Sequence, residues 1–233
     1  TTLYWKCVES HSIPLTMRFD FLAALCTFTA LATSSVLPER AATQDFRAVS
    51  FNIRYAAPAG IYERPWSTRG PLVTSQLRSA ATAATNAGSI PVIGLQEVLH
   101  QQLLDVKSGL GSSWSHIGTG RDNGRQSGEY VPILYQSSVL RLLSSTQKWL
   151  SPTPDTPSFW PGAGSRRYVI VGIFEVIQTG KRVIVANTHL DNVSQAARVE
   201  GVKIAVKTIR DVQAQWGSDL GVVLTGDFNS QPG

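Results

Sequence analysis

The chain has 233 residues, of which 42% are hydrophobic and 16% are charged. This length and composition allow a full hydrophobic core and exclude an intrinsically disordered chain. The formal net charge of +5 is mild, and the basic residues are spread along the chain rather than gathered in a nucleic-acid-binding tail. The charge favours weak attraction to anionic substrates or surfaces, although a solvated surface without such a role is the simpler interpretation.

The N-terminal part has the layout of a secretory signal peptide. Met17 opens a short basic start, which is followed by an apolar run (19–31) and a group of small residues. The apolar run is shorter than the ~20 residues of a membrane span, so an anchor or a buried helix is the weaker alternative. We therefore expect a non-native upstream segment at 1–16, a signal peptide at 17–35, and a secreted, extracellular protein without stable membrane association.

Both cysteines of the sequence, Cys7 and Cys26, lie in this N-terminal part. The mature chain would then have no disulfide, no thiolate nucleophile and no cysteine-ligated metal. A serine hydrolase also has little support, because the sequence lacks the G-x-S-x-G pattern of a nucleophile elbow.

From residue 45 onward, strand-like and helix-like stretches alternate. Short runs of apolar and β-branched residues indicate strands, and apolar residues at helical spacing indicate helices. No linker or internal repeat divides this part, so one domain is expected at 45–233. In chain order we predict a strand at 46–53, a helix at 71–88, a strand at 90–98, a helix at 100–110, strands at 131–135, 166–177 and 181–188, a helix at 194–216 and a strand at 220–225.

The fold class follows from one pair of these strands. The strands at 166–177 and 181–188 are joined around Gly180 and predict a hairpin. An antiparallel pair argues against a doubly wound parallel sheet and favours mixed sheets. Together with the helices, it predicts an α/β (α+β) fold in which two sheets form a β-sandwich with helices on the outside.

Polar residues that can bind a cation or a phosphate lie at the ends of four predicted strands. Their side chains are carboxylates, amides and one imidazole, which suit Mg²⁺, Mn²⁺ or Ca²⁺ better than a closed zinc site. Each residue has an ordinary structural alternative, such as a turn, a helix cap or a buried histidine. Their recurrence at four strand ends favours one shared site for a cation and a phosphate. These residues are Asn52, Gln96, Glu97, Asn187, His189, Asp191, Asp227 and Asn229.

Four motifs resemble the endonuclease/exonuclease/phosphatase superfamily, which has the DNase I-like fold. They are "FNIR", "LQEV", "NTHLD" and "TGDFN", they occur in this order, and the resemblance extends from Phe46 to Gly233. Intervening pieces, including "SGEYVPILY", are similar to a secreted or bacterial subgroup with unassigned substrates. The resemblance implies a four-layer sandwich and a metal-dependent phosphoesterase that uses Mg²⁺, with Mn²⁺ or Ca²⁺ as alternatives.

The resemblance also implies roles for individual residues. Glu97 would be the principal metal ligand, with Asn52 beside it. His189 would contact the scissile phosphate, while Asp227 orients or deprotonates the attacking water and Asn229 holds the phosphate. Further residues are expected around the substrate or behind the residues that touch it, namely Asn187, Asp191, Arg198, Glu129 and Arg167.

The sequence departs from the family pattern after "GDFN". Family members continue with further strands that supply a late aspartate and a final histidine as the general base, whereas only "SQPG" follows Asn229 here. We therefore predict a C-terminally truncated, partial catalytic domain with little or no activity, because a lost general base costs ~10²–10⁴-fold in rate. A non-catalytic binding or interaction domain that retains the fold is the alternative.

The substrate stays open at this level. A phosphate ester is expected, and DNA, RNA, a phospholipid headgroup, an inositol phosphate and a small phosphodiester all fit, so a nuclease is one option. The chain is expected to be a monomer. The sequon at Asn192 is a candidate N-glycosylation site next to the expected site residue Asp191.

Overall fold

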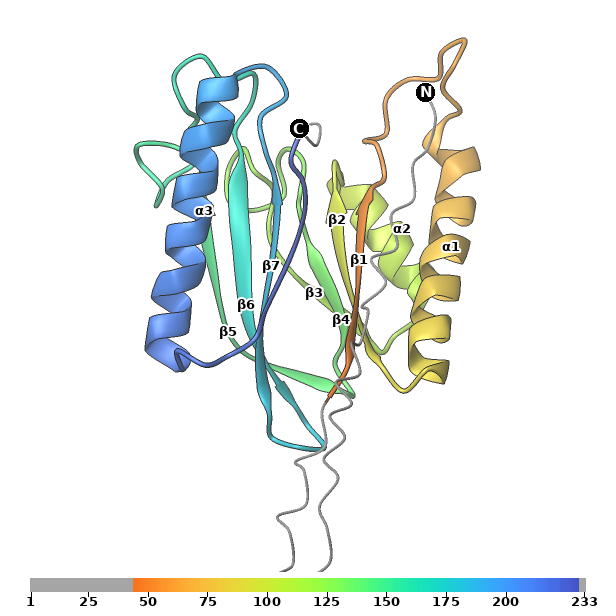
Figure 1. Ribbon diagram of the computed structural model, residues 1–233. Helices are drawn as coiled ribbons and strands as arrows, with labels where there is room; N and C mark the ends of the chain where they lie inside the picture. Colours follow the sequence, from red (N-terminus) through yellow and green to blue (C-terminus); the bar gives the residue numbers. More distant parts are fainter. Residues whose placement is uncertain (1–43, 231–233) are drawn as a thin grey trace, which may run out of the picture. The chain divides into compact units, whose positions relative to one another are not determined.

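The computed structural model describes residues 44–230. The expected upstream segment (1–16) and signal peptide (17–35) lie outside these residues, as do both cysteines. The described residues form two four-stranded sheets and three helices (Figure 1). The strands are β1 (Phe46–Asn52), β2 (Ile90–Gln96), β3 (Trp114–Ile117), β4 (Ile133–Gln136), β5 (Leu140–Trp149), β6 (Tyr168–Val176), β7 (Arg182–His189) and β8 (Val222–Asp227), and the helices are α1 (Trp66–Asn86), α2 (His100–Leu110) and α3 (Gln195–Trp216).

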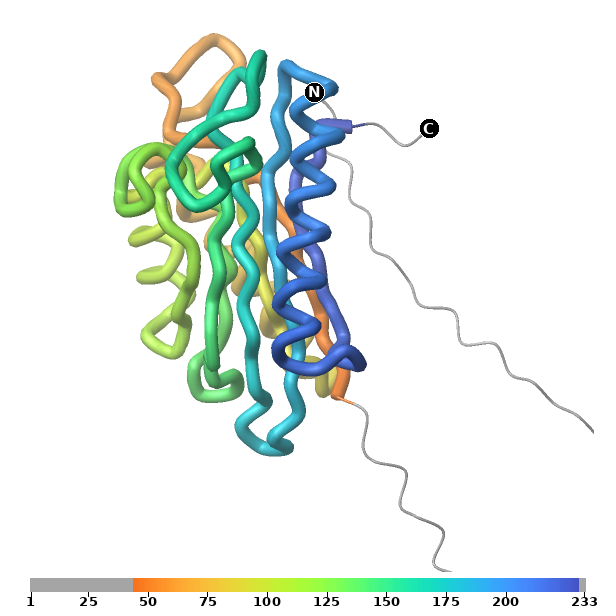
Figure 2. Tube along the Cα trace, turned by 90° about the vertical axis from the view of Figure 1, so that its left-hand side faces the viewer, coloured from red at the N-terminus to blue at the C-terminus, as the bar shows by residue number. Residues whose placement is uncertain are grey.

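The two sheets pack face to face, and the helices cover their outer faces. The strand order is β1-β2-β4-β3 in one sheet and β5-β6-β7-β8 in the other. Each sheet contains one parallel pair, β1 with β2 and β7 with β8, and its other pairs are antiparallel. α1 and α2 lie against the first sheet and α3 against the second (Figures 1 and 2). The predicted sandwich of two mixed sheets between helices is therefore confirmed.

The core lies in the layers that the sequence makes most apolar. All seven residues of β2 and eight of the nine residues of β6 are buried, because both strands are covered on two faces. The helices bury one stripe each, including Leu77 of α1 and Ile209 of α3. None of the described helices is both long enough and apolar enough to span a membrane.

The sheets approach each other closely at Gly94 of β2. A Cβ atom on Gly94 would lie 2.0 Å from Thr225 Oγ1 and 2.9 Å from Asn187 Oδ1. Real atoms do not come so close, so a side chain at this position would push the two sheets apart. Glycine at this position allows the sheets to meet just below the ends of their central strands.

Asn187 of β7 is fully buried at this contact. Its Nδ2 donates to the carbonyl groups of Leu95 (2.8 Å) and Pro132 (3.0 Å). Its Oδ1 accepts from Gln96 Nε2 (2.9 Å) and Thr225 Oγ1 (3.0 Å). All of its hydrogen-bonding capacity is used between the sheets, so Asn187 lies behind the strand-end residues and has none left for a substrate.

Replacing Asn187 by leucine, which has a similar volume, is expected to lower the free energy of unfolding by about 3 kcal/mol or more. The change leaves buried donors and acceptors on both sheets without a partner, and each such group costs about 1–3 kcal/mol. Urea unfolding would measure the loss. Asn86→Leu, at the exposed end of α1, is the matched control and should change stability by less than about 0.5 kcal/mol. A loss below about 1 kcal/mol in the Asn187 variant would contradict the inter-sheet role.

Three elements differ from the sequence-based expectation. α1 begins at Trp66 rather than at Pro71, which lies in the second turn of the helix. β3 and β5 were not predicted, and both are edge strands that need less apolar sequence than a central strand. β3 has only four residues, and in β5 a register shift between Leu142 and Ser144 interrupts the alternation of apolar and polar residues.

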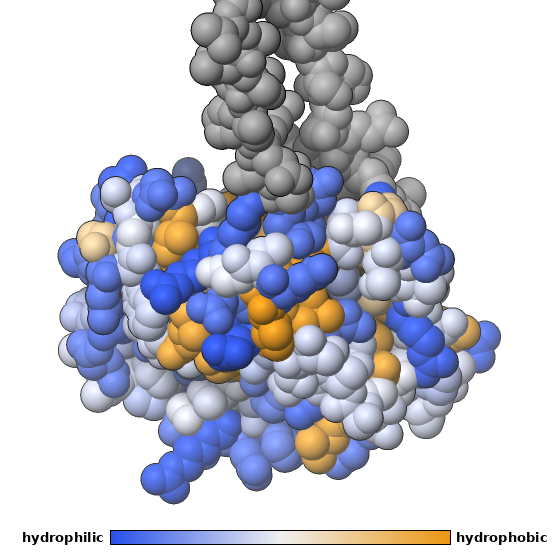
Figure 3. Space-filling model, turned by 90° about the horizontal axis from the view of Figure 1, so that it is seen from below, coloured by the Kyte–Doolittle hydropathy of each residue, from blue (hydrophilic) through white to orange (hydrophobic). Residues whose placement is uncertain are grey.

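Apolar side chains are exposed at the end of the sandwich opposite the polar strand-end residues. Figure 3 views the molecule from the end that is lower in Figure 1, and apolar side chains gather there among polar ones. Ile177, which follows β6 in the turn to β7, is 43% exposed, and Val222 at the start of β8 is 40% exposed. The polar residues that follow β1, β2, β7 and β8 lie at the opposite end (Figure 1).

Candidate active site

Four strands end close together at the upper end of the sandwich in Figure 1. β1 ends at Asn52 and pairs in parallel with β2, after which Glu97 follows. β7 ends at His189, which lies opposite Asp227 at the end of β8. Because the two sheets face each other, polar residues predicted from four separate strand ends meet at one place.

The Asn52 amide joins the two sheets at this end. Its Nδ2 donates to Glu97 Oε1 (2.8 Å) and to Asp227 Oδ2 (2.9 Å). The backbone N–H of Arg54 donates to Asn52 Oδ1 (2.9 Å) and thereby fixes the orientation of the amide. The backbone N–H of Tyr55 donates to Glu97 Oε2 (3.3 Å). Two carboxylates therefore share one amide as a hydrogen-bond donor.

His189 lies beside the same aspartate. Its side chain is 6% exposed, and its Nε2 lies 3.6 Å from Asp227 Oδ2. Asn229 Nδ2 lies 3.0 Å from His189 Nε2 and donates to Leu190 O (2.9 Å), and its backbone N–H donates to Asp227 Oδ1 (3.0 Å). Because an amide nitrogen only donates, a neutral His189 offers the lone pair of Nε2 to this contact. Asn229 thus orients both His189 and Asp227.

Burial and neighbouring charges set the protonation states of these groups. Burial, followed by the nearby Arg167 guanidinium, lowers the pKa of His189 to about 4, so its imidazole is neutral at pH 7. Burial alone would raise the pKa of Asp227. Hydrogen bonds from Asn52 and Asn229 nevertheless bring that pKa below its ordinary value, and the carboxylate is ionised at pH 7.

Backbone strain is concentrated at the same strand ends. Among the described residues, those other than glycine with positive φ are Arg54 (57°), Glu97 (57°) and Asn229 (46°). Each follows the end of a strand, and this conformation costs on the order of 1–3 kcal/mol for a residue with a side chain. Strain of this kind persists where surrounding contacts over-determine the backbone, and it clusters at functional sites.

A small cavity next to His189 is lined by arginine side chains. Arg121, Arg166 and Arg167 line it together with Glu129. Arg121 forms a two-pronged ion pair with Glu129, at 2.7 Å and 3.0 Å. Burial raises the pKa of Glu129, and the charge of Arg121 opposes this effect. The cavity is therefore rich in hydrogen-bond donors, and it adjoins His189.

Some of these donors have no acceptor in the described part of the chain. The buried N–H groups without a hydrogen-bond acceptor are Nε of Arg121, Nε of Arg166, and both Nε and Nη1 of Arg167. Arg167 Nε lies 3.7 Å from Asp191 Oδ2, which is an ion-pair contact beyond hydrogen-bond distance. Arg167 is only 7% exposed, and burial lowers its pKa below the ordinary value. A buried guanidinium with unpartnered N–H groups is costly unless an acceptor binds to it. The cavity has a volume of only about 10 Å³, so it has room for a single oxygen atom, from a water or from a phosphate, as the acceptor.

Comparisons with protein-family sequence models and with curated protein sequences gave no match. Solved structures do match. An endonuclease/exonuclease/phosphatase from Bacteroides vulgatus is 30% identical to this chain, with a TM-score of 0.70, over 81% of this chain and 67% of that protein. This chain belongs to the endonuclease/exonuclease/phosphatase family.

Two further structures agree. An endonuclease/exonuclease/phosphatase family protein from Bacteroides thetaiotaomicron is 30% identical, with a TM-score of 0.69, over 78% of this chain and 62% of that protein. A mannosyl-6-phosphatase from the same species is 30% identical to this chain, with a TM-score of 0.66, over 79% of this chain and 66% of that protein. The chain spans about two thirds of the length of these family members. The predicted family and the DNase I-like fold are thereby confirmed.

Asp191, two residues after the end of β7, connects the loop that follows His189 to the loop before β6. Asp191 is 2% exposed, and its carboxylate accepts hydrogen bonds from four backbone N–H groups, while Arg198 Nη1 donates to its carbonyl oxygen (2.9 Å). Asp191 and Arg198 therefore brace the loop that follows His189, one of the two roles expected for them. Asn192 Oδ1 accepts from Arg167 Nη2 (2.9 Å), and its glycosylation stays a prediction. The four N–H groups belong to Gly164, Ser165, Val193 and Ser194.

The residues present fit a hard divalent cation. Mg²⁺ in proteins uses one or two carboxylates together with waters and substrate oxygens, and Glu97 and Asp227 offer carboxylate oxygens. Asn52 Oδ1 accepts one hydrogen bond, from the Arg54 N–H, and keeps a second lone pair. The negative charge of Glu97 and Asp227 is only partly compensated, because the two carboxylates share one neutral amide donor and, of the two, only Glu97 forms an ion pair with an arginine in the described part of the chain, Arg54 Nη1 at 3.5 Å from Oε2. Within residues 44–230, no three His, Cys, Asp or Glu side chains form a metal cage. The donor set therefore suits a hydrated hard cation better than a fully protein-ligated one.

Sequence analysis missed three arginines of this site. Arg121 and Arg166 line the cavity beside His189, and Arg54 contacts Glu97. Two of them carried a signal, because Arg54 is the last letter of "FNIR" and Arg166 immediately precedes Arg167. Arg121 lies in a polar loop with no pattern that distinguishes it from a solvated arginine.

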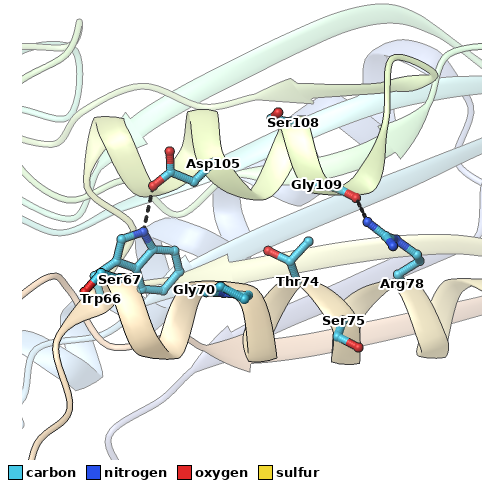
Figure 4. A pocket seen from close by; sticks show the side chains of 10 residues that line it. Trp66, Ser67, Gly70, Thr74, Ser75, Arg78, Asp105, Ser108 and Gly109 are labelled. Atoms are coloured by element: carbon cyan, nitrogen blue, oxygen red, sulfur yellow. Dashed lines mark hydrogen bonds between the residues drawn. The ribbon is translucent and has the colours of Figure 1, made fainter.

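A larger hollow lies elsewhere, between α1 and α2 (Figure 4). Its volume is about 530 Å³, and its walls come from both helices. Trp66 Nε1 donates to Asp105 Oδ2 (2.8 Å) at one end, and Arg78 donates to Gly109 O at the other. None of the strand-end residues lines this hollow, so it is not part of the candidate active site.

Proposed function

We propose that this chain carries the metal-binding and phosphate-binding residues of a divalent-metal-dependent phosphoric ester hydrolase. One observation carries the proposal: the Glu97 and Asp227 carboxylates share the Asn52 amide, and His189 beside Asp227 lines a cavity together with the buried Arg167. Within the described residues, two N–H groups of Arg167 have no hydrogen-bond acceptor. The carboxylates attract a cation and the arginine attracts an anion, so a phosphate ester with its divalent cation satisfies both. The relative named mannosyl-6-phosphatase supports the same class of reaction.

Each side chain has a role in this proposal that follows from its chemistry. Glu97 and Asn52 would hold the cation, which when bound would neutralise charge on a phosphoryl oxygen. Arg167 would donate its unpartnered N–H groups to non-bridging phosphate oxygens. Ionised Asp227 would accept a hydrogen bond from the attacking water and orient it toward the phosphorus. His189 is uncharged at pH 7, so it would contribute a hydrogen bond rather than a positive charge.

These groups are better suited to binding and orienting than to taking a proton. The pKa of Asp227 lies below its ordinary value, which makes this carboxylate a weak base near neutral pH. The other described histidines lie outside the strand-end cluster, because His100 bonds to the Tyr130 hydroxyl and His116 lies in β3. We therefore expect this chain to bind metal and phosphate but to turn over slowly.

The test is hydrolysis of a panel of phosphate esters by the purified chain, with Mg²⁺ or Mn²⁺ and with EDTA. The panel compares mannose 6-phosphate and p-nitrophenyl phosphate with bis(p-nitrophenyl) phosphate and an oligonucleotide. Slow hydrolysis of at least one ester is expected, and EDTA should lower it at least about 10-fold. With the metal present, Asp227→Asn should lower the rate of the wild-type chain by ~10²-fold, because the attacking water is no longer oriented. Asp211→Asn, on the exposed side of α3, should have no effect.

Two outcomes would decide against this function. Hydrolysis that EDTA leaves unchanged would contradict the metal dependence. Binding of Mn²⁺ and inorganic phosphate without turnover of any ester would favour the alternative of a non-catalytic binding domain that retains the fold.

A further inference from the structure

Gln102, in the first turn of α2, connects the segments that follow β1 and β2. Its side chain is almost fully buried, with 1% exposure. Its Oε1 accepts from the backbone N–H groups of Leu99 (3.0 Å) and Ala56 (3.0 Å). Its Nε2 donates to the carbonyl oxygen of Arg54 (3.0 Å). One carboxamide therefore joins the chain just beyond Asn52 to the chain just beyond Glu97.

Arg69 of α1 holds the same segment from the other side. Its Nη1 donates to Ile53 O (2.7 Å), and its Nη2 donates to Tyr55 O (3.1 Å) and Arg54 O (3.3 Å). Three successive carbonyl groups thus accept hydrogen bonds from side chains of two helices rather than from a strand. The middle one belongs to Arg54, whose φ of 57° needs such support.

The segment held in this way carries the donors that orient the proposed metal ligands. The backbone N–H of Arg54 donates to Asn52 Oδ1, and the backbone N–H of Tyr55 donates to Glu97 Oε2. A displacement of residues 53–56 would therefore turn the Asn52 amide and release one oxygen of Glu97. Partners of this kind fix the direction in which metal ligands point, and their loss typically costs 10–100-fold in metal affinity.

An ordinary structural role explains only part of what Gln102 does. Its bond to the Leu99 N–H satisfies the N-terminus of α2, as a capping residue does. The bonds to Ala56 N–H and Arg54 O do nothing for the helix, because both partners lie more than 40 positions away. Those two bonds act on the segment that orients Asn52 and Glu97.

We propose that Gln102 is a positioning residue of the metal site, which acts through residues 54–56 to hold Asn52 and Glu97 in the geometry that a divalent cation needs. This inference rests on the proposed function, because it assumes that these two residues bind the cation. Arg69 shares the task, and Gln102 is the residue that also ties the segment to the exit of β2.

The test measures Mn²⁺ binding to the full chain by electron paramagnetic resonance, without any substrate. Gln102→Met keeps the length of the side chain and removes all three hydrogen bonds, so its Kd for Mn²⁺ is expected to rise at least about 10-fold. Gln101→Met is the matched control, because Gln101 is exposed on the same helix turn and bonds only to Asp105. Its Kd should stay within about 2-fold of the wild type.

A second variant guards against loss of folding. Arg69→Gln removes the other support of residues 53–55 without changing α2, and it should also raise the Kd for Mn²⁺ by roughly 10-fold. Thermal unfolding of the metal-free variants tests whether they are folded. If Gln102→Met does not fold, the Kd of Arg69→Gln for Mn²⁺ decides whether residues 53–55 support the metal site. Wild-type affinity in the folded variants would overturn the inference and leave the proposed function intact. No Mn²⁺ binding by the wild type would overturn both.

Discussion

Replacement of Glu97 by glutamine is expected to lower Mn²⁺ affinity by more than about 100-fold and to abolish the metal-dependent hydrolysis. The loss of a ligand should exceed the 10–100-fold cost of losing a residue that only supports one. The glutamine keeps the shape of the side chain, and its oxygen still accepts the hydrogen bond from Asn52 Nδ2. The other oxygen becomes an NH2 group, so the change removes the negative charge, one candidate ligand atom and the acceptor of the Tyr55 N–H. Calorimetric titration with Mn²⁺ measures the effect.

The control for this experiment lies on the other sheet. Glu175 of β6 pairs with Arg141 (3.3 Å) and Arg182 (3.8 Å) near the surface, away from the strand-end residues. Glu175→Gln should leave Mn²⁺ affinity unchanged, because surface ion pairs of this type contribute little. Unchanged Mn²⁺ affinity in the Glu97 variant would refute the metal site as described.

Replacement of Arg167 by methionine is expected to weaken the binding of inorganic phosphate by about 100-fold. A hydrogen bond to a charged group is worth about 1.5–3 kcal/mol, and Arg167 offers two buried N–H groups that have no hydrogen-bond acceptor in the described part of the chain. Stability is expected to fall as well, because the replacement removes one partner of a buried ion pair and leaves the Asp191 carboxylate without Arg167 Nε at 3.7 Å. The relief from burying a guanidinium, whose pKa burial already lowers, offsets part of this loss. Phosphate titration and urea unfolding measure the two effects separately.

The combination of the two results is what distinguishes a binding role for Arg167. Replacement of an arginine with only a structural role would lower stability and leave phosphate affinity unchanged, whereas replacement of a ligand-binding arginine lowers phosphate affinity whatever the change in stability. Arg182→Met removes an exposed arginine and should change neither quantity. A large loss of stability with unchanged phosphate affinity would show that Arg167 serves only to pair with Asp191 and Asn192.

The strand-end residues could be predicted from sequence for a simple physical reason. Polar residues that follow an apolar strand lie at a sheet edge, and parallel strands bring their ends to the same edge. This logic placed Asn52, Glu97, His189 and Asp227 together without coordinates. It could not separate residues facing the cleft from residues facing the core, so for Asn187 it left open a place around the substrate or one behind the residues that touch it. Asn187 lies buried between the sheets.

The supporting residues were out of reach of the same logic. Gln102 and Arg69 lie on helices whose apolar spacing shows which face is buried, but spacing does not show where a long polar side chain ends. The partners of Gln102 include carbonyl and N–H groups 46 and 48 positions earlier, which carry no sequence signal at all. Arg121 was missed for a related reason, because its partner Glu129 becomes informative only once both line one cavity.

The contact between Gly94, Asn187 and Thr225 lies two or three residues before Glu97, His189 and Asp227 along their strands. At about 3.3 Å per residue, this contact is roughly 7–10 Å from the reacting groups. A rotation of one sheet relative to the other about this contact would displace the strand ends less than the distant β6–β7 turn, because the strand ends lie closer to the contact. The spacing between site residues contributed by different sheets would therefore change little.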